Sequence, residues 1–360
     1  MKSIICDIHN IYFKSEGYKQ LNAIIESENY SKIFLLVDTN THQLCAGHFL
    51  GQLKTDIPIE IIEIEAGEVH KTIDTCVGVW NALSELDGDR KSLMINLGGG
   101  VITDLGGFVA STFKRGIDYI NVPTTLLAMV DASVGGKTGV DLGHLKNQIG
   151  VIHSSKLVLV DFSFIDFLPK DQMRSGLAEM LKHGLIVDEI YWRQLSHLPH
   201  LNLSDLEQLI YDSIVIKHNI VMEDPSEDGI RKALNFGHTL GHAIESYFLT
   251  HTNKTALLHG EAIAIGMILA TYISFKLLNF PKNKLEEITN VLQKTYPKVT
   301  FEPDDYTPII SLLKFDKKNS HGNVNFVLLK DIGVTTIDCI VENELILEAF
   351  NYYNTFQIAL

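Results

Sequence analysis

Apolar residues in the first half of the chain gather in short runs that predict buried β-strands. The runs are rich in branched apolar side chains and cover residues 32–37, 59–64, 92–97, 119–122 and 157–160. Stretches with helical character separate several of them, including one that follows Gly67. Because strands that alternate with helices usually form parallel sheets, we expect an open, mostly parallel sheet with helices on both faces.

From about residue 170 onward, apolar residues recur at helical spacing instead. The predicted helices cover residues 175–186, 203–219, 231–248, 260–275 and 284–294, and a hairpin at 324–329 and 335–340 precedes a final helix. We therefore expect an α/β N-terminal nucleotide-binding domain over residues 1–170 and a mainly α-helical C-terminal domain over residues 171–360.

The longest apolar run, residues 262–275, is too short to span a bilayer, and residues 1–10 lack the apolar stretch of a signal peptide. The sequence therefore predicts a soluble, cytoplasmic protein. Its formal net charge of −14 argues against nucleic acid or an anionic membrane as the main partner, so an anionic ligand needs a local group of basic residues. The four cysteines lie far apart, and we expect core thiols rather than disulfides or a zinc ribbon.

Residues 123–141 are rich in glycine, hydroxyl and charged residues, which is typical of a binding segment rather than a structural one. Gly135, Gly136 and Gly139 are expected to let the backbone approach a ligand closely, and Lys137 offers a cation. The segment contains Gly-Gly-Lys-Thr but is not a P-loop, because Asp131 stands where that motif requires glycine.

A second glycine turn, Gly98-Gly99-Gly100, joins a predicted strand to a predicted helix. This arrangement allows a pyrophosphate to approach the backbone at a helix N-terminus, although a tight structural turn has the same pattern. Asp38 follows an early strand and is a candidate for a ribose contact or for a helix cap.

Residues that bind metals occur at three places in the helical half. Glu179 lies on the first predicted helix, His238 and His242 share one helix face, and His259 comes near the start of a further helix. One carboxylate and two imidazoles leave a coordination position open, as in catalytic zinc sites. Thr239 stands where a zincin has its glutamate base, which excludes that class.

Basic residues accompany these motifs, namely Arg115, Lys137, Lys146, Lys182, Lys217 and Arg231. Each alone is typical of a solvated surface. Their coincidence with the glycine turns and the His/Glu helices predicts a small, multiply anionic substrate. The residues by themselves thus indicate a nicotinamide-type cofactor, a divalent metal and an anionic substrate.

Taken together, the motifs resemble those of the 3-dehydroquinate synthase family, within the sugar phosphate cyclases. The resemblance extends from Val37 to Lys318, and its most specific parts are residues 98–104, 115–117, 123–141 and 234–245. It implies a nucleotide-binding α/β domain, a helical domain, and an active site in the cleft between them.

The resemblance also implies roles for particular residues. Zinc, or alternatively cobalt, is expected on Glu179, His238 and His259. NAD is expected to contact Asp38, Asn40, Glu68, Lys71, Gly99, Gly100, Val101, Asp104, Thr124, Thr125, Lys137 and Lys146.

The implied substrate is 3-deoxy-D-arabino-heptulosonate 7-phosphate. Its carboxylate is expected to meet Lys137, Arg231 and Asn235, and its phosphate Asn147, Lys182, His242 and Lys317 or Lys318. Asp131, Lys217 and Glu227 are expected to complete the surroundings, and Arg115 to come from the neighbouring subunit of a homodimer. The implied reaction is transient oxidation by NAD, elimination of phosphate, reduction by the same cofactor and an intramolecular aldol closure.

Three alternatives stay open at this point. Other sugar phosphate cyclases use the same metal and cofactor, although Arg231, Asn235 and His242 favour a substrate with a carboxylate. Metal-dependent alcohol or glycerol dehydrogenases share the glycine turn, but they do not need so many basic residues. A binding protein descended from the enzyme is disfavoured by the complete metal trio.

Overall fold

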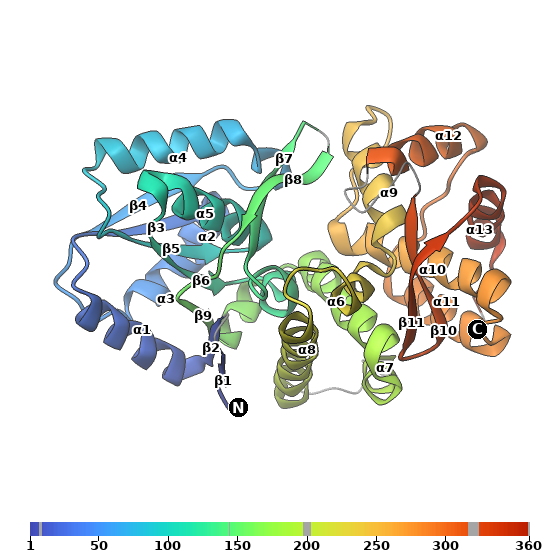
Figure 1. Cartoon of the computed structure of the whole chain (residues 1–360), viewed down its shortest axis with the longest axis horizontal. Coiled ribbons are helices and arrows are strands. Elements are labelled where there is room, and N and C mark those ends of the chain that lie inside the picture. The colour runs from blue at the N-terminus through green and yellow to red at the C-terminus, as the bar shows by residue number, and fades with distance from the viewer. Residues whose placement is uncertain (7–8, 144, 197–202, 316–323, 359–360) are drawn as a thin grey trace. The chain divides into compact units, whose positions relative to one another are not determined.

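The computed structural model describes residues 1–6, 9–143, 145–196, 203–315 and 324–358 (Figure 1). The chain forms two compact units. Unit 1 comprises Met1–Met173 and Ile210–His218, and unit 2 comprises Arg174–Leu209 and Asn219–Leu360. The sequence indicates a boundary at residue 170 but gives no sign that a short piece of the helical half belongs with unit 1.

Unit 1 is built on a seven-stranded sheet with the strand order β1-β2-β9-β6-β5-β3-β4. β1 and β2 are antiparallel, and all other neighbours are parallel. The strands are β1 (Ile4–Ile5), β2 (Asn10–Phe13), β3 (Ile33–Asp38), β4 (Ile59–Ile64), β5 (Leu93–Gly98), β6 (Asp118–Pro123) and β9 (Leu157–Val160). The five predicted strands and the mostly parallel sheet are confirmed, whereas the β1–β2 hairpin was not predicted.

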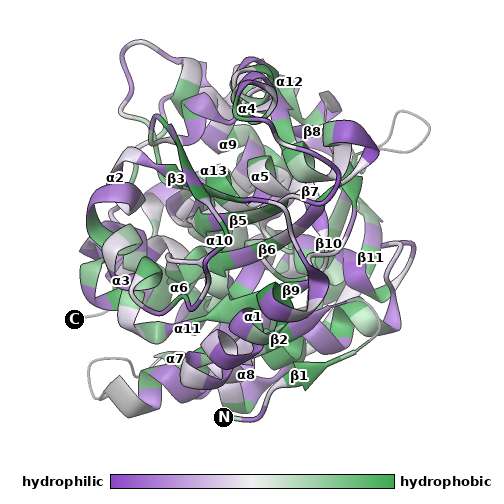
Figure 2. Cartoon of the chain, turned by 90° about the vertical axis from the view of Figure 1, so that its left-hand side faces the viewer, coloured by the Kyte–Doolittle hydropathy of each residue, from purple (hydrophilic) through white to green (hydrophobic). Residues whose placement is uncertain are grey.

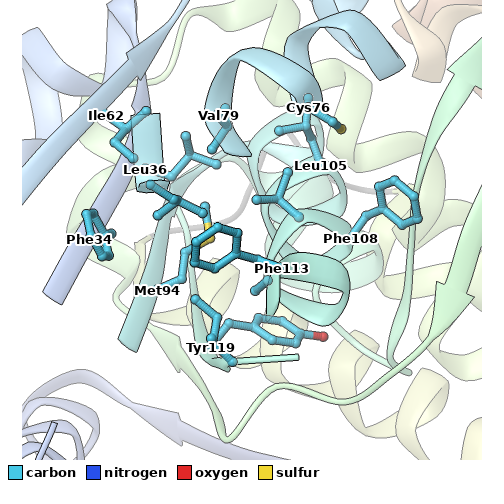
Figure 3. Packing of buried hydrophobic residues seen from close by; sticks show 14 of the residues in the cluster. Phe34, Leu36, Ile62, Cys76, Val79, Met94, Leu105, Phe108, Phe113 and Tyr119 are labelled. Carbon is cyan, nitrogen blue, oxygen red and sulfur yellow. The ribbon is translucent and has the colours of Figure 1, made fainter. Parts of the chain in front are cut away.

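Helices lie on both faces of this sheet (Figure 1). They are α1 (Lys14–Glu28), α2 (Thr39–Thr41), α3 (Gly47–Leu50), α4 (Ile73–Glu85) and α5 (Gly100–Thr112). One face carries the core against α4 and α5, where Phe34, Leu36 and Met94 of the strands meet Val79 and Leu105 of the helices (Figure 3). Burial of such large apolar side chains supplies about 1.5–3 kcal/mol each toward the stability of the unit.

The hydropathy pattern follows this layering. The strands of the sheet are mainly hydrophobic, whereas α1 and α4 alternate hydrophobic and hydrophilic bands (Figure 2). On α4 the buried residues are Cys76, Val79 and Leu83, which recur at the three- and four-residue spacing of one helix face.

The segment from residue 123 onward is more regular than its composition suggests. It contains the π-helix η4 (Ala128–Ala132) and the antiparallel hairpin of β7 (Lys137–Leu142) and β8 (Leu145–Ile152). A Cβ atom on Gly139 would lie 2.4 Å from the carbonyl oxygen of Ile149. The expectation that Gly139 admits a ligand is therefore wrong, because its missing side chain admits the neighbouring strand.

Unit 2 is mainly helical and contains one small β-hairpin, which confirms the secondary structure predicted for the second half of the chain. Its elements are α6 (Lys170–Val187), α7 (Glu189–Ser196), α8 (Leu203–Glu223), α9 (His238–Thr250), α10 (His259–Leu278), α11 (Lys282–Thr295), α12 (Pro303–Leu312), β10 (Asn325–Asp331), β11 (Val334–Ile340) and α13 (Asn343–Thr355). Of these, α6 begins in unit 1, and residues Ile210–His218 of α8 belong to unit 1.

One predicted helix is wrong in its extent. Residues 231–248 form a 3₁₀ segment, Ile230–Asn235, followed by α9, because Gly237 takes a φ of 77° between them. A left-handed residue interrupts the helical hydrogen bonds and restarts the helix in a new direction.

The central helix of unit 2 is α10. It extends beyond the apolar run at 262–275, and by length and composition it could cross a membrane. However, 67% of its apolar window is buried inside the structure, as in the core helix of a globular unit.

The four cysteines are free, and only Cys45 and Cys76 are buried. The expectation of core thiols is wrong for Cys6 and Cys339, which are partly exposed.

Candidate active site

In unit 2, glycines bring α9 and α10 into close contact. A Cβ atom on Gly266 would lie 2.0 Å from the carbonyl oxygen of Gly237, and one on Gly241 would lie 2.8 Å from the side chain of Ile263. Contacts this short exclude a side chain at either glycine. The crossing places His238, at the start of α9, 5.6 Å from His259 at the start of α10, measured between ring centroids.

The start of α10 is equally close to α6. The amide of Gly260 donates to Ser175 Oγ at 3.0 Å, and a Cβ atom on Gly260 would lie 2.2 Å from the Ser175 carbonyl oxygen. Glu179 follows Ser175 by one helical turn and therefore lies on the same face of α6. Three helices thus converge on Glu179, His238 and His259.

The two imidazoles face one carboxylate oxygen. Nε2 of His238 lies 3.4 Å from Glu179 Oε1, and Nε2 of His259 lies 3.5 Å from the same atom. On the other side of each ring, His238 Nδ1 lies 3.1 Å from the carbonyl oxygen of Phe236, and His259 Nδ1 lies 3.0 Å from Glu245 Oε2. Both acceptors favour a proton on Nδ1, so that in the neutral form of each ring the Nε2 lone pair is directed at the space beside Glu179.

The electrostatics of this trio favour a cation. Burial alone would raise the pKa of Glu179, but Lys182, His238 and His259 outweigh it and hold that pKa well below its ordinary value. Burial opposes the charged form of His259, yet Glu245 and Glu179 raise its pKa to about 10. Oε1 of Glu179 is buried and accepts no hydrogen bond of ordinary geometry within the described residues. The donor set of one carboxylate and two imidazoles therefore fits a divalent metal such as zinc.

His242 is a neighbour of this trio. Its ring centroid lies 5.0 Å from that of His238 and 5.7 Å from that of His259, and one nitrogen from each of the three rings lies within 4.8 Å of the others. The prediction that His238 and His242 share a helix face is confirmed. Its expected role at the substrate phosphate stays a prediction.

Two basic residues of unit 2 are buried with defined partners. Lys182 donates to Oε2 of Glu179 and is 1% exposed. Arg231 is 2% exposed and donates to the carbonyl oxygen of Pro225 at 2.7 Å. Burial of a cation is costly, so it indicates that the position is specified rather than incidental.

The loop before Arg231 is organised by Asp224. Its carboxylate accepts from the backbone amides of Asp228, Gly229 and Arg231 at 2.7–3.1 Å, and these bonds lower its pKa against the effect of burial. In the same region Asn235 donates to Glu227 Oε1 at 3.0 Å. The structure thus brings Glu227, Arg231 and Asn235 together on one short segment.

In unit 1, the candidate cofactor residues lie at the carboxyl edge of the parallel strands. The chain proceeds from β3 outward to β4 and then returns to β5 on the other side of β3, so the connections reverse between β3 and β5. Ligands of doubly wound sheets bind at such a reversal. Asp38 ends β3 there, and Gly98 ends β5 with Gly99 as the N-cap of α5.

The glycine turn has distinct roles along its length. A Cβ atom on Gly98 would lie 2.5 Å from the Ile102 side chain, so that glycine serves packing. Gly99, Gly100 and Val101 are partly exposed, and no side chain caps α5. The first turn of α5 therefore offers backbone amides to an anion. Thr124 and Thr125 follow the next strand, β6, and the Thr124 amide donates to Gly98 at 3.0 Å.

Asp38 caps the short helix α2, since its Oδ1 accepts from the amide of Thr41 at 2.8 Å. The helix-cap interpretation of Asp38 is confirmed, and its ribose contact stays a prediction. Asn40 is exposed in that helix.

A polar cluster connects the remaining cofactor candidates. Lys71 Nζ lies 2.7 Å from Asp104 Oδ2 and 2.7 Å from Asn147 Oδ1, and Lys146 forms an ion pair with Glu68. Burial opposes the charge of Lys71, but Asp104 and Glu68 raise its pKa. The expected phosphate ligand Asn147 thus joins the group of expected NAD contacts.

A second pair of charged residues joins η4 to α8. Lys217 donates to the backbone oxygen of Asp131 at 2.5 Å and to its Oδ1 at 2.6 Å. Both residues belong to unit 1, because α8 contributes Ile210–His218 to it. Lys137 begins β7 and is partly exposed, and Arg115 is exposed with a φ of 73°.

Lys317 and Lys318 lie outside the described residues. Three residues were missed as site residues: Ser175, Asp224 and Glu245. The bonds of Asp224 are local, since the amides that it accepts from lie four to seven residues further along the chain. The contacts of Ser175 with Gly260 and of Glu245 with His259 depend on tertiary packing.

Family models described as 3-dehydroquinate synthase N-terminal and 3-dehydroquinate synthase C-terminal match residues 61–175 and 176–319. The chain is 43% identical over 340 residues to the 3-dehydroquinate synthase of Parabacteroides distasonis, covering 93% of this chain and 94% of that protein. It is 37% identical over 346 residues to the 3-dehydroquinate synthase of Helicobacter pylori, covering 96% and 98%.

Solved structures show the same fold. A 2-deoxy-scyllo-inosose synthase complexed with carbaglucose-6-phosphate, NAD⁺ and Co²⁺ has a TM-score of 0.80 at 25% identity, covering 97% of this chain and 98% of that one. An iron-containing alcohol dehydrogenase has a TM-score of 0.69 at 13% identity, covering 99% and 100%, and this likeness concerns the fold alone.

Proposed function

The chain belongs to the 3-dehydroquinate synthase family, and on this premise we propose that it converts 3-deoxy-D-arabino-heptulosonate 7-phosphate to 3-dehydroquinate and phosphate. It is then a carbon–oxygen lyase of the shikimate pathway and works in the cytoplasm. The observation that carries the proposal is the convergence of the His238 and His259 Nε2 atoms on the buried Oε1 of Glu179.

Glu179, His238 and His259 would hold the metal, for which zinc is the first candidate and cobalt the second. A bound divalent cation supplies polarisation of the hydroxyl and carbonyl oxygens of the substrate. Glu245 and the Phe236 carbonyl keep the two rings in the tautomer that presents Nε2. Lys182 donates to Glu179 Oε2, and it would be available to an anionic oxygen of the substrate if Glu179 served as a metal ligand.

NAD would be held by the first turn of α5 and by the polar residues at the carboxyl edge of the sheet. Bound NAD supplies a hydride acceptor that returns the hydride later in the same cycle. Thr124, Thr125 and the amides of Gly99 and Gly100 orient the pyrophosphate and nicotinamide portions. Lys71 and Lys146 neutralise Asp104 and Glu68 and keep this edge from repelling the cofactor phosphates.

The substrate carries a carboxylate and a phosphate, and the chain offers cations for both. Arg231 and Asn235 present a guanidinium and an amide from one short segment of unit 2, which suits bidentate binding of a carboxylate. Lys182 and His242 lie beside the metal trio and suit the phosphate. Asp131 with Lys217 and the partly exposed Lys137 are the corresponding groups of unit 1, and Glu227 accompanies Asn235.

The decisive assay follows inorganic phosphate. Protein loaded with zinc and a catalytic amount of NAD should release one phosphate per heptulosonate phosphate consumed, with no net NADH. Stoichiometric NADH from a simple polyol, without phosphate release, would instead identify a dehydrogenase. Activity on a hexose phosphate that lacks a carboxylate, with none on the heptulosonate phosphate, would identify another sugar phosphate cyclase.

We also propose that the chain acts as a homodimer in which Arg115 serves the active site of the neighbouring subunit. Its side chain is exposed on unit 1, which supports a role toward another molecule. Inactive Arg115→Ala and His259→Ala variants, unfolded together and refolded, should regain about a quarter of the wild-type activity, since half of the dimers are mixed and each mixed dimer has one intact site. A mixture as inactive as its components would show that Arg115 acts within its own chain.

A further inference from the structure

We propose that Cys6, His9 and His218 form a second metal site, for a thiophilic divalent transition metal such as Zn²⁺, at the N-terminal hairpin of unit 1. One ligand atom of each residue lies within 4.8 Å of the other two. All three belong to unit 1, whereas Glu179, His238 and His259 belong to unit 2. The proposed site therefore shares no ligand with the candidate metal site of unit 2.

Two of the ligands flank the paired ends of β1 and β2, since Cys6 follows β1 and His9 precedes β2. The Cys6 amide donates to the His9 carbonyl oxygen at 3.3 Å, and the His9 amide donates to Cys6 Sγ at 3.3 Å. The sulfur and the imidazole of this Cys-x-x-His sequence thus lie next to the pairing of Ile5 with Asn10. The Cys6 thiol itself donates to the His9 carbonyl oxygen at 3.0 Å, and a metal bound to the sulfur would take the place of this proton.

The third ligand comes from α8. His218 Nδ1 lies 3.1 Å from His9 Nε2, and the two rings meet edge to face with centroids 5.1 Å apart. Two nitrogens bound to one tetrahedral zinc ion at 2.0–2.1 Å lie about 3.3 Å apart. A metal would therefore replace the shared proton between these nitrogens with a shift of only a few tenths of an ångström.

The packing around the ligands holds their elements in register. Phe13 of β2 contacts Tyr211 of α8, with ring centroids 5.2 Å apart. His9 and Phe13 are four residues apart along an extended strand, and Tyr211 and His218 are seven apart on one helix face. The hairpin therefore runs along two turns of α8, and the imidazole pair lies at the end of this contact.

The ligand set selects the kind of metal. One thiolate and two imidazoles suit Zn²⁺, Co²⁺ and related transition metals, whereas Mg²⁺ and Ca²⁺ prefer oxygen ligands. Three protein ligands leave a fourth position for water.

A metal at this position would clamp the part of α8 that belongs to unit 1 and carries Lys217. His218 follows Lys217, whose Nζ binds the backbone oxygen and carboxylate of Asp131. Successive helical side chains leave the axis about 100° apart, so fixing His218 on the hairpin also fixes the rotation of the helix that directs Lys217. The clamp acts on position and stability and contributes no group to the reaction.

The test uses Co²⁺ and the full-length chain. The candidate active site has no sulfur ligand, so a sulfur-to-cobalt charge-transfer band in the near ultraviolet reports the Cys6 site alone. Wild-type protein is expected to bind about two equivalents of Co²⁺ and to show this band. Cys6→Ser is expected to lose the band and about one equivalent, and Cys339→Ser, which alters the other partly exposed thiol, is expected to keep both.

His218→Asn provides a second variant that leaves Cys6 and His9 unchanged, and it should weaken the charge-transfer band and the binding of the second equivalent in the same way. Far-ultraviolet circular dichroism and binding of the first equivalent show that each variant is folded. Absence of the band in wild-type protein, or its persistence in Cys6→Ser, would overturn the proposal. Because the readout is independent of turnover, failure of the proposed reaction would leave this result unaffected.

Discussion

Replacement of Glu245 tests whether the orientation of His259 determines metal binding. The carboxylate accepts from His259 Nδ1 at 3.0 Å and is buried on α9, which holds the bond in a fixed place. Glu245→Gln keeps a hydrogen-bond acceptor but removes the charge. Glu245→Leu removes both, and the ring can then turn or change its tautomer.

The expected loss of metal affinity follows from the hydrogen bond of Glu245 to His259, which is one of the expected metal ligands. Loss of such an outer partner typically weakens metal affinity 10- to 100-fold, or about 1.4–2.7 kcal/mol. We expect about 10-fold for Glu245→Gln and about 100-fold for Glu245→Leu in alkaline buffer. Near neutral pH the loss should be smaller, because Glu245 and Glu179 raise the pKa of His259 to about 10 and the retained proton competes with the metal in the wild type.

Zinc affinity is measured by competition with a chromophoric chelator at about pH 7 and about pH 9. Glu261→Gln is the matched control, because Glu261 lies on α10 and accepts from the Leu258 amide at 2.9 Å, a cap that glutamine can maintain. The control should bind zinc as the wild type does. If Glu245→Leu binds zinc as tightly as the wild type at both pH values, or if the difference narrows as the pH rises, the reasoning is refuted.

Three further predictions concern packing, charge and thiol reactivity. Gly266→Ala should destabilise the protein by about 1–3 kcal/mol or more in urea unfolding, because the new Cβ atom would lie 2.0 Å from the Gly237 carbonyl oxygen. In the control variant Gly78→Ala, on α4, the new Cβ atom meets nothing within 4 Å, so this variant should be as stable as the wild type or more stable. Lys71→Met should cost about 3 kcal/mol by leaving Asp104 without its cation, compared with under about 1 kcal/mol for Lys156→Met at the surface. Burial opposes the charge of Lys71, but Asp104 and Glu68 raise its pKa above that of an ordinary lysine. The stabilisation is therefore complete below about pH 10 and is lost only above it. If the difference in unfolding free energy between wild type and variant became smaller from pH 7 to pH 9, the ion pair would be wrongly assigned. Burial raises the pKa of Cys45 to about 11 and that of Cys76 to about 12. A thiol reagent at pH 8 should therefore modify the partly exposed Cys6 and Cys339 faster than these two buried cysteines. Equal modification rates for all four cysteines would show that the core opens readily.

The architecture was readable from the sequence wherever one element buries a continuous apolar pattern. The strands β4 and β9 have the predicted bounds, and β3, β5 and β6 differ from theirs by one residue at each end, because a strand buried on both faces needs an uninterrupted apolar run. The β1–β2 hairpin was not predicted, since β1 has only two residues and β2 has four, which is too short for a clear apolar pattern. The predicted helix over residues 231–248 was longer than α9, because the helical spacing of apolar residues continues across Gly237. That spacing does not reveal the positive φ of Gly237.

The candidate site, too, could be predicted from the sequence only in part. The residue types themselves indicated Glu179, His238 and His259, because carboxylates and imidazoles beside glycines are unusual on apolar helices. Their shared focus depends on helix crossings set by Gly241, Gly260 and Gly266, where backbone meets backbone at distances that no local pattern encodes. The role of Glu245 as the partner of His259 arises from the same crossings.

What the sequence by itself determined is the order of elements, the kind of ligand each motif can bind and the family to which the chain belongs. What only the tertiary structure decided is which of these groups share a proton or a charge. It ties Asn147 to Lys71, Lys217 to Asp131, and His218 to His9. The physical reason is that periodicity records which face of an element is buried, whereas hydrogen bonds and charge pairs depend on side chains from distant segments reaching within about 3 Å of each other.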